Sequence, residues 1–426
     1  MYKHYQDALA ICRVHGNPQY FLTFTCNVNW PEIRRYVTRY PVLKAQDRPD
    51  IIARVFHMKV ASFVNFLRNN RPFGNVTADL YTIEFQKRGL PHCHLLLWVA
   101  ETNKITDATH VDRYISAEIP DPVIDPELHR IVTDFMIHGP CGTVRPNASC
   151  MSFGMCSKNF PKAYQQSSMI DENGYAHYKR WMTGNTVLKG GVALDNRYVV
   201  PYNRALLLHF QAHINVEYCG WSMLIKYLFK YISKGSDRIR FNISKGPSSA
   251  DTESDTTFEI DEIKNYVDGR FICPHESAWR ILDFHIHQRN PAVQVLAVHL
   301  QEMQGVTFRD NDQLENIVRN PLSRRTTLTE WLYNNCIDES GRHLTYVDFL
   351  SEYKWDASSK TWLRRITNRT NQRLGDLSTY TQCVVKRSTC VYCCHTKKVV
   401  DPSRTFAQFL ERYAQHTVLH VKGLDY

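Results

Sequence analysis

Apolar residues in the first hundred positions follow spacings that predict a strand, a helix and two further strands. Residues 20–26 are rich in aromatic and β-branched side chains and predict a buried strand. Residues 51–69 repeat large apolar side chains at helical intervals, and strands are expected at about 77–86 and 92–100. This order predicts an α+β fold in which helices pack on one side of a small antiparallel sheet.

Residues 84–94 predict two strands joined by a turn that contains Gly and Pro. A strand has a side-chain period of two, so His92 and His94 point to one face, and Glu84 and Gln86 share a face of the incoming strand. A carboxylate and two imidazoles can hold one divalent ion with open coordination positions, as catalytic metal sites do. The alternative is a pair of half-buried strand histidines without a ligand.

Residues 222–235 predict an amphipathic helix with one apolar stripe. The opposite side carries three lysines, Lys226, Lys230 and Lys234. Tyr227 and Tyr231 lie one turn apart at the boundary between the stripe and these lysines, where tyrosine commonly serves packing alone. Two phenols beside three cations also suit attack on a phosphodiester, which would give a covalent phosphotyrosine.

A second possible metal site lies in the segment of about 101–205, between the two motifs. His138, Cys141, Cys150 and Cys156 have the spacing His-x2-Cys-x8-Cys-x5-Cys, in a Gly- and Pro-rich stretch with little else to make a core. Thiolates combined with imidazole favour zinc in a closed, structural, tetrahedral site. Because this spacing is not that of a standard zinc finger, unliganded reduced cysteines are the alternative.

Composition agrees with a nucleic-acid-binding protein. The chain has 426 residues, and its 52 Lys plus Arg exceed 42 Asp plus Glu, for a formal net charge of +10. A basic surface attracts a phosphate backbone. No apolar run approaches the length of a bilayer span and no signal peptide opens the chain, so we expect no membrane partner. The 13 cysteines are therefore expected to be free thiols or metal ligands.

The ordered set of motifs resembles the endonuclease domain of helitron transposases, in the His-hydrophobic-His superfamily of rolling-circle replication initiators and relaxases. It comprises His92-Cys93-His94 with an upstream acid, followed by Tyr227-x-x-x-Tyr231. Further similar stretches are 5–13, 21–31, 138–142, 156–162 and 213–235, so the resemblance covers roughly residues 5–365. Cys93 is a small, soft side chain that fits the apolar middle position.

The resemblance implies a ferredoxin-like endonuclease core that carries a cysteine-containing insertion and a mixed C-terminal accessory region. The expected core is 1–100 and 206–300, followed by an accessory region at 301–365 and an unmatched tail at 366–426. Mg²⁺ or Mn²⁺ would be held by Glu84, His92 and His94, with Gln86 as the alternative third ligand. Tyr227 or Tyr231 would be the nucleophile on single-stranded DNA, with the three lysines on its phosphates, and the family implies a nuclear location.

Two features of the C-terminal half refine this expectation. The aromatic residues between Trp331 and Trp362 predict either a hydrophobic core, which is favoured, or a platform for unpaired bases. Helitron transposases normally continue into a helicase, but the sequence contains no Gly-x-x-x-x-Gly-Lys-Ser/Thr loop. No ATP site is therefore expected, and a helicase would act in trans. The alternatives to a nicking enzyme are an inactive or domesticated single-stranded-DNA-binding protein and a metal-binding structural protein.

Overall fold

The chain folds into two compact units. A computed structural model describes residues 2–40, 42–85, 90–105, 107–172, 174–219, 272–299, 320–366 and 373–379. Unit 1 comprises residues 1–5 and 15–289, and unit 2 comprises residues 6–14 and 290–426. Helix α1 (Tyr2–His15) therefore contributes residues to both units.

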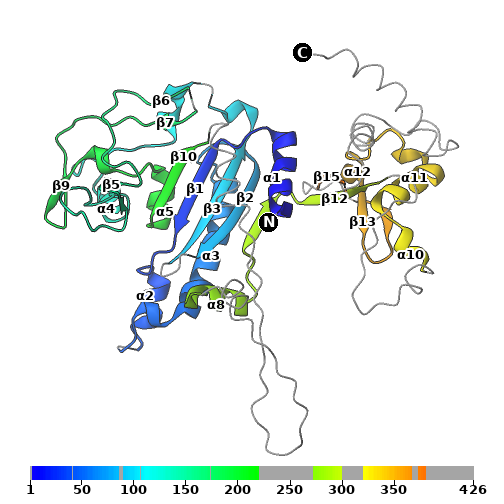
Figure 1. The fold of residues 1–426 in the computed structure, drawn as a ribbon, viewed down its shortest axis with the longest axis horizontal. Coiled ribbons are helices and arrows are strands. Elements are labelled where there is room, and N and C mark those ends of the chain that lie inside the picture. Colours follow the sequence, from blue (N-terminus) through cyan, green and yellow to red (C-terminus); the bar gives the residue numbers. More distant parts are fainter. Residues whose placement is uncertain are drawn as a thin grey trace, which may run out of the picture. The chain divides into compact units, whose positions relative to one another are not determined.

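The centre of unit 1 is a five-stranded sheet (Figure 1). In spatial order its strands are β10 (Ile214–Tyr218), β1 (Tyr20–Thr25), β3 (Pro91–Val99), β2 (Val76–Phe85) and β11 (His287–Asn290). Strand β3 pairs antiparallel with both β1 and β2, and β1 pairs antiparallel with β10. The three N-terminal strands agree with the predicted ones to within 1 residue at each end. Strands β10 and β11 are not among the predicted strands.

Helices cover one face of the sheet. The longest is α3 (Pro49–Asn69), whose Phe56, Val60 and Phe63 are buried at the spacing of a single helical stripe. The Phe63 ring stacks on Phe24 of β1, with 4.6 Å between centroids. The same layer contains α2 (Pro31–Val37), α5 (Arg204–Phe210) and α8 (Pro274–Ile281). The predicted α+β class with a small antiparallel sheet is confirmed, while the ferredoxin-like arrangement stays a prediction.

The segment between β3 and α5 contains one helix and three short hairpins. The described α-helix is α4 (Pro126–Phe135), and short 3-10 helices lie at η2 (Glu101–Asn103), η3 (Ala108–Arg113) and η4 (Asn196–Tyr198). The hairpins are β4 (Met151–Ser152) with β5 (Met155–Cys156), β6 (Met169–Ile170) with β7 (Ala176–His177), and β8 (Val187–Lys189) with β9 (Val192–Leu194).

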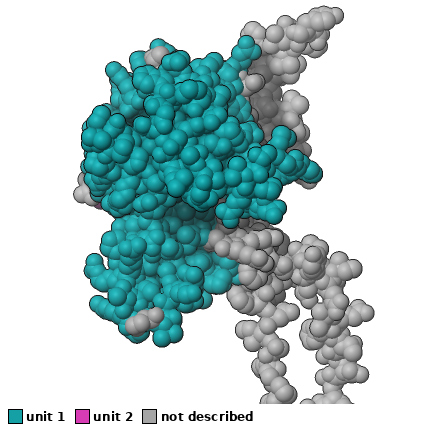
Figure 2. Space-filling view, turned by 90° about the vertical axis from the view of Figure 1, so that its left-hand side faces the viewer, with its two compact units in different colours: residues 1–5, 15–289 teal, residues 6–14, 290–426 magenta. Residues whose placement is uncertain are grey.

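This insertion shares the hydrophobic core of the sheet. Ile131, Val132 and Tyr202 are buried in the same cluster as Phe24. The buried Arg180 guanidinium donates hydrogen bonds to the carbonyl oxygens of residues 117, 196 and 199, which ties distant parts of the insertion together. In the space-filling view, which faces the side where α4 and β9 lie, unit 1 forms one continuous surface (Figure 2). The insertion therefore builds no separate apolar core around its cysteines, and the buried side chains on either side of them join the core of the sheet.

Unit 2 has its own aromatic core. Its described elements are β12 (Val293–Val298), α10 (Pro321–Arg324), α11 (Thr327–Ile337), η6 (Glu339–Gly341), α12 (Phe349–Glu352), β13 (Tyr353–Asp356), β14 (Thr361–Arg364) and β15 (Leu374–Thr379). Strands β12 and β15 pair in parallel, and β13 and β14 form a hairpin. The buried side chains include Trp331, Tyr346, Phe349 and Trp362, so these aromatic residues form the favoured hydrophobic core.

Candidate functional site

The face of the sheet opposite α3 carries a group of polar side chains around strand β3. Register pairs His92 with Glu84 of β2 and with Thr25 of β1, and it pairs His94 with Thr23. Because strand side chains alternate between faces, Glu84, His92 and His94 lie on one face, while Cys93 between the histidines is buried in the helix-covered core. We call Thr23, Thr25, Glu84, His92 and His94 the polar face.

His94 is held by contacts on several sides. Its Nε2 lies 2.9 Å from Oε2 of Glu84, and its Nδ1 lies 3.1 Å from the hydroxyl of Thr23. The Phe21 ring stacks parallel to the imidazole, with 5.7 Å between centroids. The His94 side chain is only 8% exposed and that of Glu84 is 23% exposed, so their contact lies just below the solvent-accessible surface.

His92 is fixed by a similar contact with the neighbouring strand. Its Nδ1 lies 2.8 Å from the Thr25 hydroxyl, and its ring centroid lies 6.5 Å from that of His94. Burial, together with the nearby His94 and His213, lowers the pKa of His92 to about 4. The imidazole is therefore neutral near pH 7, which is the form that binds metals. With Nδ1 turned to Thr25, Nε2 is the atom left for a ligand.

A third histidine joins this group from far along the chain. His213 immediately precedes β10, and its backbone carbonyl accepts a hydrogen bond from the Thr25 amide at 3.0 Å. Its Nδ1 lies 3.3 Å from the Thr25 hydroxyl, so one hydroxyl lies between two imidazoles. Burial lowers the pKa of His213 to about 4. A further threonine and histidine pair lies toward the opposite edge of the sheet, where the Thr82 hydroxyl is 2.8 Å from Nδ1 of His287.

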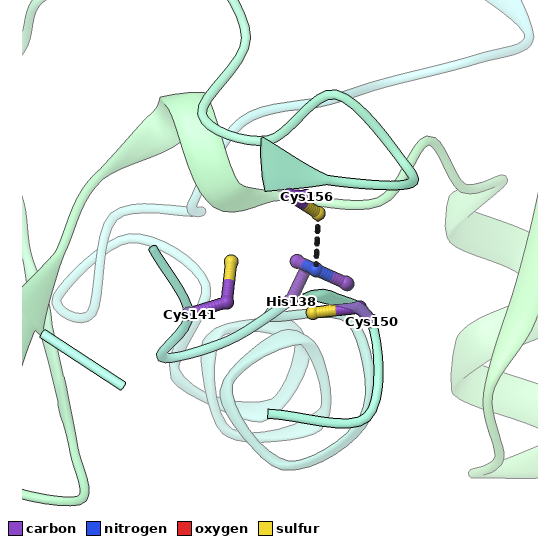
Figure 3. A group of neighbouring side chains, drawn as sticks. All are labelled: His138, Cys141, Cys150 and Cys156. Carbon is purple, nitrogen blue, oxygen red and sulfur yellow. Dashed lines mark hydrogen bonds between the residues drawn. The ribbon is translucent and has the colours of Figure 1, made fainter. Parts of the chain in front are cut away.

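The second group of ligand-type side chains lies in the insertion. One ligand atom from each of His138, Cys141, Cys150 and Cys156 lies within 4.8 Å of all the others (Figure 3). Sγ of Cys156 is 3.4 Å from Nε2 of His138. The sequence spacing predicts this convergence correctly. We call these four residues the Cys/His cluster.

Local backbone geometry brings the four side chains together. Gly139, with a φ of 104°, lets the chain turn between His138 and Cys141, and Gly142, with a φ of 80°, turns it again directly after Cys141. Cys150 directly precedes β4 and Cys156 ends β5, so the short hairpin brings these two cysteines close in space. The His138 ring stacks on Phe160, with 4.2 Å between centroids, and this contact orients the imidazole.

The cluster has the electrostatics of a thiolate metal site. Burial and the neighbouring thiols raise the pKa of Cys141 to about 12. Burial also raises the pKa of Cys156, but the backbone amides of Phe160 and Lys158 and the neighbouring thiols outweigh it, so that the pKa falls below its ordinary value. The Cys156 thiol therefore ionises more readily than the Cys141 thiol. This donor set could hold a metal ion such as zinc.

A comparison of the sequence with protein families finds a match for the N-terminal part of the chain. Residues 1–97 match the family described as "Helitron helicase-like domain at N-terminus". Residues 1–97 are therefore similar to the N-terminal domain of the helitron family, and we call them the helitron-type domain. The match supports the resemblance for the motifs that lie within these residues. No curated protein matches the chain.

The helitron-type domain contains the polar face but neither of the other two predicted sites. The matched 97 residues include β1, α3, β2 and most of β3, and therefore Glu84, His92 and His94. The Cys/His cluster and His213 lie beyond the matched segment. Gln86 and the five residues of the predicted tyrosine helix (Lys226, Tyr227, Lys230, Tyr231 and Lys234) lie outside the described residues.

Two kinds of residue in the polar face are missed by the motif-based analysis. Thr23 and Thr25 alternate along the predicted strand, so the pattern places them on one face, but their pairing with the histidines depends on the β1–β3 register. His213 opens the similar stretch 213–235, but it is 188 residues from Thr25, and no sequence pattern indicates that the two side chains meet. Among the described residues, no helix is long and apolar enough to cross a membrane.

Proposed function

We propose that this chain is a tyrosine-dependent endonuclease and strand transferase that nicks and joins single-stranded DNA, as in helitron-type rolling-circle transposition. The observation that carries the proposal is the convergence of Glu84 and His94, at 2.9 Å, next to His92 within the helitron-type domain. This arrangement is the kind of donor set that a metal-dependent nuclease needs. The proposal covers the nicking and joining steps only.

In this proposal the polar face holds a divalent cation. It offers one carboxylate and two imidazoles, and the Thr23 and Thr25 hydroxyls hold both rings through Nδ1. Metal-binding histidines usually have their second ring nitrogen fixed in this way. We assign Mg²⁺ or Mn²⁺ to Glu84, His92 and His94, with Gln86 as the alternative third ligand. When bound, such an ion polarises the scissile phosphate.

The nucleophile in this proposal is the phenol of Tyr227 or Tyr231. Its oxygen forms a bond to phosphorus, the bond from phosphorus to the 3′ oxygen breaks, and the phenol proton is lost while the 3′ oxygen gains one. The products are a 5′ phosphotyrosine and a free 3′ hydroxyl, which attacks in the reverse, joining step. Two tyrosines allow two covalent ends to be held for strand transfer. Lys226, Lys230 and Lys234 would bind backbone phosphates and lower the pKa of a phenol.

The decisive experiment is a test for a covalent adduct between the purified chain and a labelled single-stranded oligonucleotide, with and without Mg²⁺ or Mn²⁺. We expect a metal-dependent adduct. Tyr227 lies closer to the lysines on the helical wheel, so Tyr227→Phe should reduce nicking by more than about tenfold. Tyr231→Phe should mainly impair joining, and phenylalanine keeps the ring so that losses report on the hydroxyl.

Other outcomes select other functions. If the double tyrosine variant still forms an adduct, neither tyrosine is the nucleophile. If both single variants nick like the parent and the double variant does not, the two phenols are interchangeable. DNA binding without any adduct would select the inactive or domesticated single-stranded-DNA-binding protein.

A further inference from the structure

The tip of the β4–β5 hairpin presents an exposed phenylalanine. Met151 pairs with Cys156 and Ser152 with Met155, so Phe153 and Gly154 form a two-residue turn. The Phe153 side chain is 100% exposed, and Met155 beside it is 73% exposed. Fully exposed aromatic side chains give no burial energy to the folded chain. Phe153 therefore packs against nothing in the described part of the protein.

The backbone at this tip is also unfavourable for phenylalanine. Phe153 has a φ of 50° and Gly154 a φ of 77°. A two-residue hairpin turn with positive φ at both positions, as in type I′ turns, favours Asn-Gly, and a bulky side chain in the left-handed region costs stability. The residue at position 153 thus assists neither the core nor the turn. Its ring is therefore available for a contact with another molecule.

The hairpin is held at its base by the Cys/His cluster. Cys150 and Cys156 flank the two strands, and both lie among the four converging ligand atoms. The backbone amide of residue 157 also donates a hydrogen bond to the carbonyl of Cys150, at 2.7 Å. A tip fixed in this way loses little conformational freedom when it binds a partner.

The charge around the hairpin fits an anionic partner. Between residues 135 and 170 the sequence has no Asp or Glu, but it contains Arg145, Lys158 and Lys162. Arg145 and Lys158 are exposed. A protein partner would need acidic groups here, whereas nucleic acid offers both phosphates for the cations and a flat base for the ring.

We propose that the β4–β5 hairpin is a second contact for single-stranded DNA, in which Phe153 stacks on an unpaired base while Arg145 and Lys158 bind the adjacent phosphates. The ligand's identity as single-stranded DNA rests on the proposed function, but the contact itself does not require nicking. Stacking on an aromatic ring tolerates any base, so this contact holds the strand without reading its sequence.

The test compares Phe153→Asn with the parent chain. Asparagine restores the Asn-Gly pair that the turn favours, so the variant should melt at the same temperature as the parent or higher, with unchanged metal content. Its affinity for a fluorescein-labelled single-stranded oligonucleotide, measured by anisotropy, should fall by about tenfold, as expected for the loss of one stacked base. Phe153→Trp should keep the affinity. Val123→Asn removes an apolar side chain that is 87% exposed beside Asp121, and it should change nothing.

Each outcome decides for or against the proposal. A gain or no change in melting temperature together with weaker binding supports it, whether or not the chain nicks DNA. If the Phe153→Asn variant and the parent bind the oligonucleotide with equal affinity, the proposed DNA contact is overturned, and Phe153 would be assigned to a protein contact. Nicking by both chains would still leave the proposed function intact. A large fall in melting temperature would show that Phe153 serves the fold. If the parent chain binds no single-stranded DNA, both this proposal and the proposed function fail.

Discussion

Thr25 and His92 face each other across strands β1 and β3, with 2.8 Å between the threonine hydroxyl and Nδ1 of the imidazole. The same hydroxyl lies 3.3 Å from Nδ1 of His213. If Nδ1 of His92 donates its proton to this oxygen, the hydroxyl proton can be donated to His213. One threonine would then set the ring orientation of His92 and leave its Nε2 directed away from β1.

We expect Thr25→Val to reduce nicking by about 10- to 100-fold, because the valine cannot hold Nδ1 of His92. The stability loss should be only about 1 kcal/mol, as for a typical hydrogen bond. High Mn²⁺ should restore part of the activity if the defect lies in ligand orientation. The measurement is single-turnover nicking at increasing metal concentration, together with denaturant unfolding.

A matched control for this variant lies on the same sheet. Thr82→Val breaks an equivalent contact, 2.8 Å from the Thr82 hydroxyl to Nδ1 of His287, but His287 is not among the assigned metal ligands. It should therefore leave nicking within about twofold of the parent at similar cost in stability. Equal losses of activity in both variants would show that the threonines act through general stability rather than through His92.

His92→Ala combined with His94→Ala should abolish nicking while the chain remains folded, because both imidazoles belong to the polar face rather than to the helix-covered core. Circular dichroism and an adduct assay check the two parts of this expectation. Cleavage that continues in excess chelator, or melting that collapses in the variant, would identify the histidines as packing residues. Glu84→Ala and Gln86→Ala, tested separately, identify the third ligand as the one whose loss Mn²⁺ partly rescues.

Cys150→Ser should remove one tightly bound zinc per chain and lower the melting temperature by at least about 5 °C, because a closed thiolate site contributes its binding energy to folding. Elemental analysis after gel filtration measures the metal, and thermal unfolding measures the stability. Cys336→Ser, at an exposed position in unit 2, is the control and should leave both unchanged. A stable parent protein that contains no zinc would refute the assignment of zinc to the Cys/His cluster.

Acid should destabilise unit 1 through His213. Its pKa falls from 6.5 to about 4 on folding, so between these values the unfolded chain binds a proton that the folded chain excludes. The contribution to stability is complete above pH 6.5 and is lost as the pH falls toward 4, by at most about 3 kcal/mol. His213→Gln should flatten the dependence of the unfolding free energy on pH, measured in chelator, whereas the same change at exposed His110 should not. An equally steep dependence in His213→Gln would place the acid-sensitive group elsewhere.

Local patterns predict the elements of the sheet well, and they also predict the Cys/His cluster. Residues 20–25 form the buried strand that their aromatic and β-branched side chains indicate, and residues 49–69 form the helix whose apolar spacing makes one buried stripe. The four cluster residues lie within one short, turn-rich stretch, where spacing alone limits how far apart they can be. The α+β class follows from the same local evidence.

The contacts that complete the polar face could not be predicted in this way. The pairing of Thr25 with His213 depends on β10 as a neighbour of β1, and 188 residues separate the two side chains. Edge strands such as β10 and β11 are short, at 5 and 4 residues, so they carry little periodic signal. The buried Arg180 is also unexpected from pattern alone, since its guanidinium is satisfied by carbonyls that only the tertiary fold brings together.

The shared core of the insertion has a consequence for which in-frame deletions the protein can tolerate. Residues 101–205 interrupt the sheet domain in sequence, yet their buried side chains fill the same core as Phe24. A deletion that removed this stretch in frame would leave a cavity in the core of the sheet rather than a trimmed surface loop. Strands β2 and β3 and the insertion therefore depend on each other for folding, and a protein that kept the strands without the insertion would not be expected to fold.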